Sequence, residues 1–254
     1  MRGINLLNAL YNSNGASIPV AFELVTKPIV YSDIETRKLK RKSEVTKNEL
    51  MRQMIRICVQ NELKFRFVLT DSWFSSEENF EFITAQGKHF ISALKDNRLV
   101  AASEEDRIHK RFTRVDELQI PEHGVVRGWL KGYAKEVLVV RQVFKNKDGS
   151  TGTLHLVCSD LTCDYDAITT TYKRRWEVEV FHKSLKSNAS LAKSPTQTTK
   201  TQSNHVFMSI CAAFKLECLS LKNKLSPFAM CRKLLIKASQ TAYAELQLLR
   251  AAAA

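Results

Sequence analysis

Apolar and polar positions divide the first part of the chain into short strands and one amphipathic helix. They alternate in Ile4–Tyr11 and in Ile18–Val25, and the Asn-Ser-Asn-Gly segment at 12–15 between these runs is typical of a turn. This stretch therefore predicts a β-hairpin. Apolar positions then repeat at helical spacing and predict a helix over residues 44–61: Val45, Leu50, Met54, Ile57 and Cys58.

A second series of elements follows the helix. Phe65–Thr70 is rich in β-forming residues and ends at Asp71, so it predicts a strand with a carboxylate at its end. Hydroxyl and acidic residues at 75–78 are typical of a helix N-terminus, and Gly87 is expected to end that helix. His89–Leu94 predicts another strand. The order to this point is β-β-α-β-α-β.

The second half of the chain changes from strands to helices. Valines and aromatics alternate with charges between residues 98 and 160, which predicts a small antiparallel β unit. A long helix is expected from Tyr165 to Lys186 and a polar loop from Ser187 to Asn204. Helices are expected again over His205–Lys222 and from about Pro227 to the alanine-rich end.

Charge favours a polyanionic partner. Lys and Arg number 39 against 26 Asp and Glu, a formal net charge of +13. A field of this sign attracts phosphate backbones, although many basic proteins bind no nucleic acid. The basic stretch at 37–42 is interpreted as a solvated loop at a helix entry, with DNA contact as the alternative.

The six cysteines predict neither a disulfide framework nor a zinc site. None form a C-x-x-C pair, and no Cys/His set has zinc-finger spacing. They are interpreted as free, mostly buried thiols in a reducing compartment. The chain start lacks the apolar stretch of a signal peptide, and the most apolar helix, Val206–Leu221, contains Lys215 and Glu217. We therefore expect no membrane span and a cytoplasmic, nucleoid-associated location.

The segment with the most chemical information lies within the long predicted helix. At about 100° per residue, Arg175, Glu179 and Lys186 fall within about 60° of Tyr172, and Lys183 lies close by. Val178, Phe181 and Leu185 form a separate apolar stripe. One acid among several bases suits a carboxylate that holds a divalent metal beside phosphates. On spacing alone, an exposed helix with i,i+4 ion pairs remains equally open.

The pattern Y-x2-R-x3-E-x6-K resembles the signature of a large group of DDE transposases from bacterial insertion sequences. The chain matches it at Tyr172, Arg175, Glu179 and Lys186. Further segments resemble members of that group: RGINLLNALY, SIPVAFELV, KRKSEVTKNEL, LTDSWFSS and KSNASLAKSPT. The resemblance covers nearly the whole chain.

The resemblance implies an α/β ribonuclease-H-like core with a β-rich insertion and C-terminal helices. The first part of the core corresponds to residues 1–97 and the insertion to 98–160. The catalytic helix and the remainder of the core correspond to 161–222, and a C-terminal helical segment to 223–254. In this family a first Asp lies on the first strand, a second Asp follows the fourth strand, and the Glu lies on a late helix.

The same resemblance implies the site residues. Asp71 matches the second catalytic, metal-binding Asp, and Glu179 matches the Glu. Tyr172, Arg175 and Lys186 match positions that contact DNA, and Lys183 lies beside them. Trp129, in the predicted insertion, resembles the aromatic that stacks on a displaced base, although packing within the β unit is an equal alternative. Trp73 is expected in the core, and Trp176 is left open. His182 and His205 have no sequence neighbours that indicate a metal site.

One departure from the family concerns the first carboxylate. Only two strands are predicted before the first helix where the family has three, and the missing one holds the first Asp. Asp33 is the nearest substitute, but its Ser-Asp context is more typical of a turn. The chain is therefore expected to be N-terminally truncated, to fold with poor solubility, and not to cleave DNA as written. The alternative is a non-catalytic DNA-binding transposase remnant that interferes with full-length copies.

For a complete family member, the resemblance implies DNA transposition by two-metal catalysis. Two Mg²⁺ (or Mn²⁺) ions about 3.5–4 Å apart promote phosphodiester hydrolysis and strand transfer. The implied partners are double-stranded DNA at the transposon ends and a second copy in a homodimeric synaptic complex, with no small-molecule substrate. A ribonuclease-H-like nuclease acting on RNA is a weaker alternative, because the signature argues against it.

Overall fold

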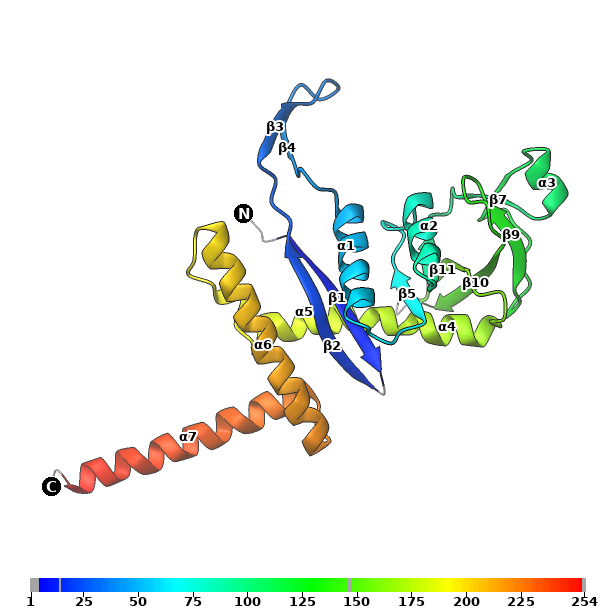
Figure 1. Cartoon of the computed structure of the whole chain (residues 1–254). Coiled ribbons are helices and arrows are strands. Elements are labelled where there is room, and N and C mark those ends of the chain that lie inside the picture. Colours follow the sequence, from blue (N-terminus) through cyan, green and yellow to red (C-terminus); the bar gives the residue numbers. More distant parts are fainter. Residues whose placement is uncertain (1–4, 14, 146–147, 253–254) are drawn as a thin grey trace. The chain divides into compact units, whose positions relative to one another are not determined.

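The computed structural model describes residues 5–13, 15–145 and 148–252, which form a mixed α/β chain of two compact units (Figure 1). Unit 1 contains the described residues up to Leu7 and Val25–Trp176. Unit 2 contains Asn8–Leu24 and the described residues from Glu177 onward. Within the described part of the chain, no helix has the length and apolar character needed to cross a membrane.

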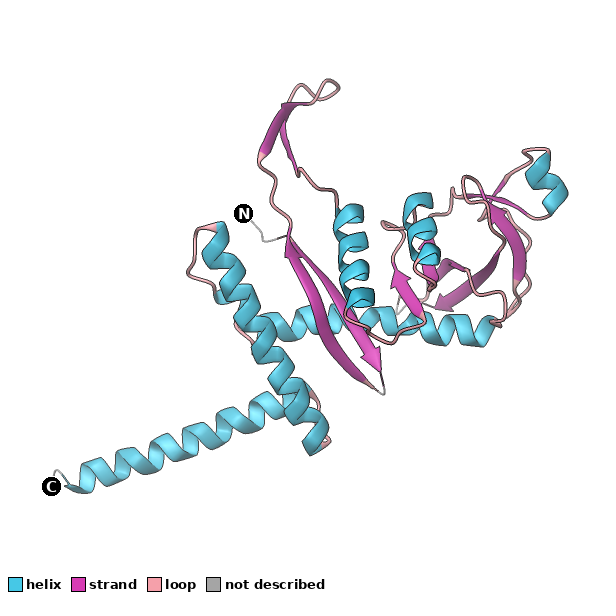
Figure 2. Cartoon of the chain, viewed as in Figure 1, coloured by secondary structure: helices cyan, strands magenta, loops and turns pink. Residues whose placement is uncertain are grey.

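A seven-stranded sheet forms the centre of unit 1 (Figure 2), in the order β5-β6-β11-β10-β9-β7-β8. Its strands are β5 (Phe67–Thr70), β6 (His89–Leu94), β7 (Leu99–Ala101), β8 (Thr113–Arg114), β9 (Val126–Leu130), β10 (Val137–Lys145) and β11 (Thr151–Cys158). β5 lies at one edge and pairs in parallel with β6, whereas the other pairs are antiparallel. The strands predicted for the insertion therefore continue the sheet that contains β5 and β6, and the division into domains stays a prediction.

Capped helices cover this sheet. Unit 1 contains α1 (Lys47–Gln60), α2 (Glu77–Ala85), α3 (Glu104–Ile108), α4 (Tyr165–Lys173) and the 3₁₀ turn η1 (Arg174–Trp176). Thr46 and Glu49 form a capping box at the start of α1, in which each side chain accepts the other residue's backbone N–H. Ser76 caps α2 by accepting from the backbone N–H of Asn79, as the hydroxyl-acid pattern predicted.

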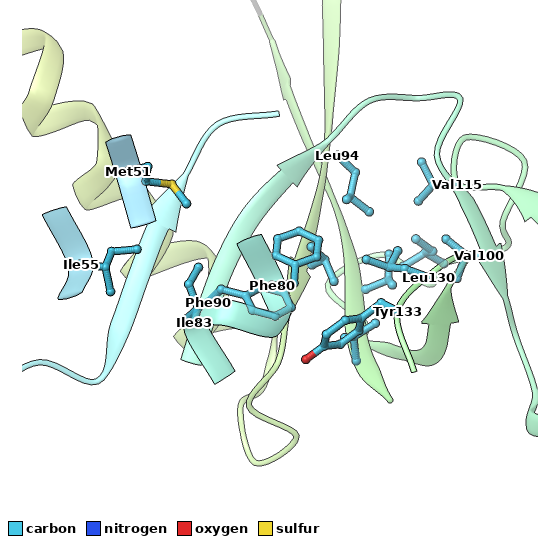
Figure 3. Packing of buried hydrophobic residues seen from close by; sticks show 14 residues of the cluster. Met51, Ile55, Phe80, Ile83, Phe90, Leu94, Val100, Val115, Leu130 and Tyr133 are labelled. Carbon is cyan, nitrogen blue, oxygen red and sulfur yellow. The ribbon is translucent and has the colours of Figure 1, made fainter. Parts of the chain in front are cut away.

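Alternating strand residues supply two hydrophobic clusters on opposite faces of the sheet. Phe90 and Val139 pack with residues of α1 and α2, and this cluster includes the stacked rings of Phe80 and Phe90, 4.0 Å apart (Figure 3). Ile91 and Leu138 pack instead with Ile168 and Tyr172 of α4. Because successive side chains of a strand point to opposite faces, helices cover both sides of the sheet.

Unit 2 combines a hairpin with three helices. β1 (Leu6–Ser13, of which Leu6 and Leu7 belong to unit 1) pairs with β2 (Ala16–Leu24), close to the predicted hairpin. The helices are α5 (Glu177–Asn188), α6 (Thr199–Asn223) and α7 (Pro227–Ala252), with the turn η2 (Leu191–Lys193). α6 contacts β2, and α5 contacts both α6 and α7. The apolar stripe of α5 is confirmed, because Phe181 and Leu185 are buried.

The basic stretch at 37–42 was predicted as a loop, and this prediction is wrong. Residues 29–42 form an exposed hairpin of β3 (Ile29–Ser32) and β4 (Leu39–Lys42). Asp33 lies in its turn, as expected, where its Oδ1 accepts hydrogen bonds from the N–H and hydroxyl of Thr36, and Lys40 pairs with its Oδ2. Pairing between β3 and β4 places these basic side chains on a hairpin, which the pattern of residues along the sequence did not predict.

The predicted helix 165–186 is interrupted. The 3₁₀ turn η1 separates α4 from α5, so the rotation of 100° per residue does not hold from Tyr172 to Glu179. The predicted loop 187–204 is shorter than expected, because α6 begins at Thr199 with Thr198 as its cap. On α1 the predicted core position Met54 is buried. Its buried neighbours are Met51 and Ile55, however, while Ile57 is 46% exposed, so the buried face is rotated from the predicted one.

The cysteines are free but mostly not buried, contrary to expectation. Cys158 is buried, Cys218 is exposed, and the other four are half-buried. Several predictions fall partly outside the described residues: the strand start at Ile4, the turn position Asn14, the turn position Lys147 and the final residues Ala253 and Ala254.

The stacked pair in the α2–β6 cluster is expected to dominate the stability of unit 1. Phe80 is 0% exposed, so Phe80→Ala should lower the free energy of unfolding by about 3–5 kcal/mol through lost burial and a cavity. Ile57→Ala, on exposed surface, should change it by no more than about 0.5 kcal/mol. Urea unfolding followed by tryptophan fluorescence reports on unit 1, which contains Trp73, Trp129 and Trp176. Equal midpoints for both variants would contradict the assigned core.

Candidate functional site

Asp71 lies at the carboxyl end of β5, where the predicted strand was expected to present it. Its exposed side chain accepts, through Oδ1, the backbone N–H of Trp73 at 2.9 Å. The backbone N–H of Phe74 donates to the Asp71 carbonyl at 3.2 Å, which closes a tight turn. This turn is typical of Asp and holds the carboxylate at the edge of the sheet.

A buried pair of hydroxyls supports this strand end. Thr70 and Ser92 are partners in the parallel register of β5 and β6. The Thr70 hydroxyl donates to the Ser92 hydroxyl at 2.8 Å, and Ser92 is fully buried. A hydrogen bond between buried hydroxyls avoids the cost of leaving either polar group unsatisfied. The sequence analysis did not assign Ser92 a role. The one feature that could have indicated it is a hydroxyl residue among the apolar residues between His89 and Leu94.

Tyr172 connects α4 to the same strand end. Its side chain is 8% exposed, and its hydroxyl donates to the Thr70 carbonyl at 3.1 Å. Burial raises the pKa of the Tyr172 hydroxyl; the nearby Arg175 lowers it, and the negative charge of Asp71 raises it. The phenol therefore keeps its proton, which the hydrogen bond to Thr70 requires. Through this bond, the residue that begins the sequence signature holds the strand that ends at Asp71.

Arg175 lies in η1, which contacts β5. Its guanidinium carbon is 6.0 Å from the centre of the Tyr172 ring and 5.9 Å from that of Trp176. Trp176 is exposed. The guanidinium thus lies between a buried and an exposed aromatic ring, an arrangement favourable for a cation and suited to presenting it to phosphates.

Trp73 was expected in the core, and this expectation is wrong. The indole is 65% exposed, and the Lys47 ammonium lies 5.8 Å from its ring centre. Phe74, the next residue of the turn, is partly buried against the hydrophobic cluster instead. The Asn79 side-chain amide donates to the Phe74 carbonyl at 2.9 Å and to Asn48 at 3.0 Å.

Beside this turn the structure has a pocket of about 400 Å³ that sequence reasoning missed. It is lined by Ser72, Trp73, Ser75, Lys95, Asn97, Arg98, Leu99 and Lys131. These residues come from three segments separated along the chain, so no sequence pattern brings them together.

The other predicted signature residues belong to unit 2. Glu179, Lys183 and Lys186 are exposed on α5. Burial lowers the pKa of the neighbouring His182 imidazole, an effect that the charge of Glu179 opposes, and its Nε2 lies 2.9 Å from the Asn8 Oδ1. The Lys183 ammonium is 5.7 Å from the Phe228 ring centre. The structure thus joins Tyr172 to the strand that precedes Asp71 and places Arg175 beside Tyr172, whereas the meeting of Asp71 with Glu179 stays a prediction.

Trp129 lies on β9 and is half-buried, with the Arg107 guanidinium carbon 5.8 Å from its ring centre. Its base-stacking role stays a prediction.

The described residues do not form a complete metal site. Carboxylate oxygens such as those of Asp71 suit Mg²⁺. In the parts of the chain that the structure describes, however, no three His, Cys, Asp or Glu side chains gather into a set that could hold an ion.

Comparison with known proteins adds one match. Residues 38–215, more than half of the chain, match the model of a family described as "Transposase DDE domain". No curated protein matches the chain.

The hydrogen bond from Tyr172 to Thr70 is expected to stabilise unit 1. Tyr172→Phe keeps the ring and leaves the buried Thr70 carbonyl without this donor, so it should lower the free energy of unfolding by about 1 kcal/mol. The matched change Tyr243→Phe, on an exposed ring, should have no measurable effect. Urea titrations of both variants test this, and an unchanged Tyr172→Phe midpoint would show that the bond has no net effect.

Proposed function

Since this chain belongs to the transposase DDE domain family, we propose that it acts in DNA transposition of an insertion sequence. The reaction class is phosphodiester hydrolysis followed by strand transfer at the element ends. Asp71 and Glu179 are the proposed catalytic carboxylates. The observation that supports this most is the position of Asp71, at the end of a parallel strand held by Tyr172 of the signature.

We further propose that unit 1 is part of a ribonuclease-H-like core. Support comes from the parallel pair β5–β6, from helices on both faces of the sheet, and from the edge position of β5. An edge strand leaves one row of backbone N–H and C=O groups for a further strand to pair with. The resemblance implies that the first Asp lies on the first, central strand of the core. The free edge of β5 is where such a strand would pair.

The basic residues of the signature are proposed to bind the DNA backbone. Arg175 presents its guanidinium beside the Tyr172 ring, and Lys186 is exposed on α5 together with the neighbouring Lys183. Arg and Lys on phosphates position a protein on DNA without reading its sequence. For Tyr172, burial favours a positioning role: it holds the backbone at Asp71 rather than contacting DNA itself.

The chain by itself is proposed not to cleave DNA. Family members generally use divalent metal ions held by three carboxylates. The resemblance assigns two of them to this chain, and Asp33, the third candidate, is engaged in the turn of the β3–β4 hairpin. Removing one ligand of a metal site weakens ion binding and leaves the charge on the reacting phosphate less neutralised. We therefore expect DNA binding without metal-dependent strand cleavage.

A cleavage assay tests this proposal. The full chain is mixed with a supercoiled plasmid that contains element-end DNA and with Mg²⁺ or Mn²⁺. At low salt it should retard the plasmid in gel electrophoresis and leave both strands intact. Asp71→Asn and Glu179→Gln are the matched controls, because each removes one carboxylate charge at nearly constant size. Nicking that disappears in both variants would contradict the incomplete site but support the transposase assignment. Failure to bind any DNA would contradict the function itself.

We propose a second copy of the chain as the protein partner. Every residue of α7 from Arg232 to Ala252 is exposed. Its leucines 235, 246 and 249 fall within about 60° of one another at helical spacing, so they form one apolar stripe. Exposed apolar stripes of this kind are typical of helix–helix association.

If the chain associates through α7, substitution of the stripe leucines should weaken its self-association. Leu235→Gln combined with Leu246→Gln should weaken self-association more than tenfold, because each buried leucine contributes about 1.5–3 kcal/mol. Leu248→Gln, on a different face of the same helix, should have little effect. Sedimentation equilibrium measures the dissociation constants. A wild-type chain that stays monomeric at every concentration, or equal effects of both sets of changes, would exclude this interface.

A further inference from the structure

We propose that the pocket beside Asp71 binds one unpaired nucleotide of the DNA strand. Its base would stack on Trp73, and its phosphate would lie among Lys95, Arg98 and Lys131. This inference rests on the proposed function, because it names the part of the DNA substrate that this region of unit 1 recognises.

The position of the pocket follows from the parallel pair of strands. β5 ends at Thr70 and leads into the turn with Ser72, Trp73 and Ser75. β6 ends at Leu94 and leads into Lys95, Asn97 and Arg98. The carboxyl ends of parallel strands lie at the same edge of a sheet, where α/β proteins commonly bind ligands. The pocket therefore opens at the edge that presents Asp71.

Backbone hydrogen bonds fix the cationic wall. The Arg98 N–H donates to the Lys95 carbonyl at 2.9 Å, and the Val115 N–H donates to the Arg98 carbonyl at 2.8 Å. The Lys131 N–H donates to the Leu99 carbonyl at 2.9 Å, which places the end of β9 beside the start of β7. Three cations thus face one space, and no acid is among its described lining residues.

Two of the residues that line the pocket each have a buried polar atom without a hydrogen-bond partner among the described residues. These atoms are Nε of Arg98 and Oγ of Ser75. Burial lowers the pKa of the Arg98 guanidinium, and the charge of Glu77 partly offsets this. Arg98 is half-buried, and a phosphate bound in the pocket would neutralise its charge where water screens it less than at the open surface. Together with Lys95 and Lys131, it favours an anionic ligand.

The aromatic wall distinguishes a nucleotide from a simple anion. Trp73 presents an exposed indole at the pocket, and stacking of a base on such a ring contributes about 1–3 kcal/mol. The volume of about 400 Å³ falls in the range of small-molecule sites, about 300–1,000 Å³. A base inside a duplex is stacked on both faces and cannot also stack on Trp73, so we infer that the ligand is a base outside the duplex stack.

The test compares three fluorescein-labelled DNAs of one sequence with the full chain. One is a blunt duplex, one has a single unpaired nucleotide at its end, and one has an abasic residue at that position. Fluorescence anisotropy gives the dissociation constants. The unpaired nucleotide should improve binding roughly tenfold over the blunt duplex, in the lower part of the range for one stacked base. The abasic residue should lose most of that gain.

Variants distinguish the contribution of Trp73 to binding from that of the cationic side chains. Trp73→Ala should abolish the preference for the unpaired nucleotide, whereas Trp73→Phe should keep part of it. Arg98→Gln should weaken binding of the overhang and reduce the slope of log K against log salt concentration by about one. Arg141→Gln, an exposed charge on β10 outside the pocket lining, is the matched control and should keep the preference. Because Trp73 is exposed, its variants should unfold at the wild-type urea concentration.

The outcomes also distinguish this inference from the proposed function. Tight binding to blunt duplex without any preference for the unpaired nucleotide would overturn the pocket and leave the function standing. A preference that survives Trp73→Ala but disappears in Trp129→Ala would overturn the pocket and place stacking on β9. If no DNA of any form binds, both proposals fail.

Discussion

The parallel pairing of β5 with β6 is the constraint on which the rest of unit 1 depends. Four residue pairs, from Phe67–His89 to Thr70–Ser92, set the register. This register aligns the ends of the two strands, so the turn after Asp71 and the connection after Leu94 lie at one edge. A shift by one residue would separate Thr70 from Ser92 and exchange the faces on which Phe90 and Ile91 pack. The packing of both clusters and the position of the carboxylate thus depend on the same hydrogen bonds.

Tyr172 joins this edge to the helix that contains the sequence signature. Its hydroxyl reaches Thr70 across 102 residues of sequence, and its ring lies in the cluster beneath the sheet. The 3₁₀ turn that follows interrupts the helix and presents Arg175 beside the ring. The structural role of Tyr172 is therefore clear: its ring fills the core, and its hydroxyl donates a hydrogen bond to the Thr70 carbonyl.

Basic side chains lie beside aromatic rings at two places in unit 1. Arg175 lies with Tyr172 and Trp176, and Lys95, Arg98 and Lys131 line the pocket with Trp73. Each place combines cations with an aromatic ring, the combination that binds single-stranded nucleic acid by phosphate contact and base stacking. Membership in the transposase DDE domain family accounts for a DNA partner, and the pocket indicates which form of DNA this edge recognises.

The sequence by itself determined the type of most elements, the strand that ends at Asp71, the caps of α1 and α2, and the family. These features depend on local periodicity and on side chains near one another along the chain. Tertiary structure alone decided that strands of the predicted insertion continue the main sheet, that Trp73 is exposed, and that Met51 rather than Ile57 is buried on α1. It also assembled the pocket from three distant segments. Strand register and the choice of buried face arise from contacts between distant residues, and a local pattern does not contain them.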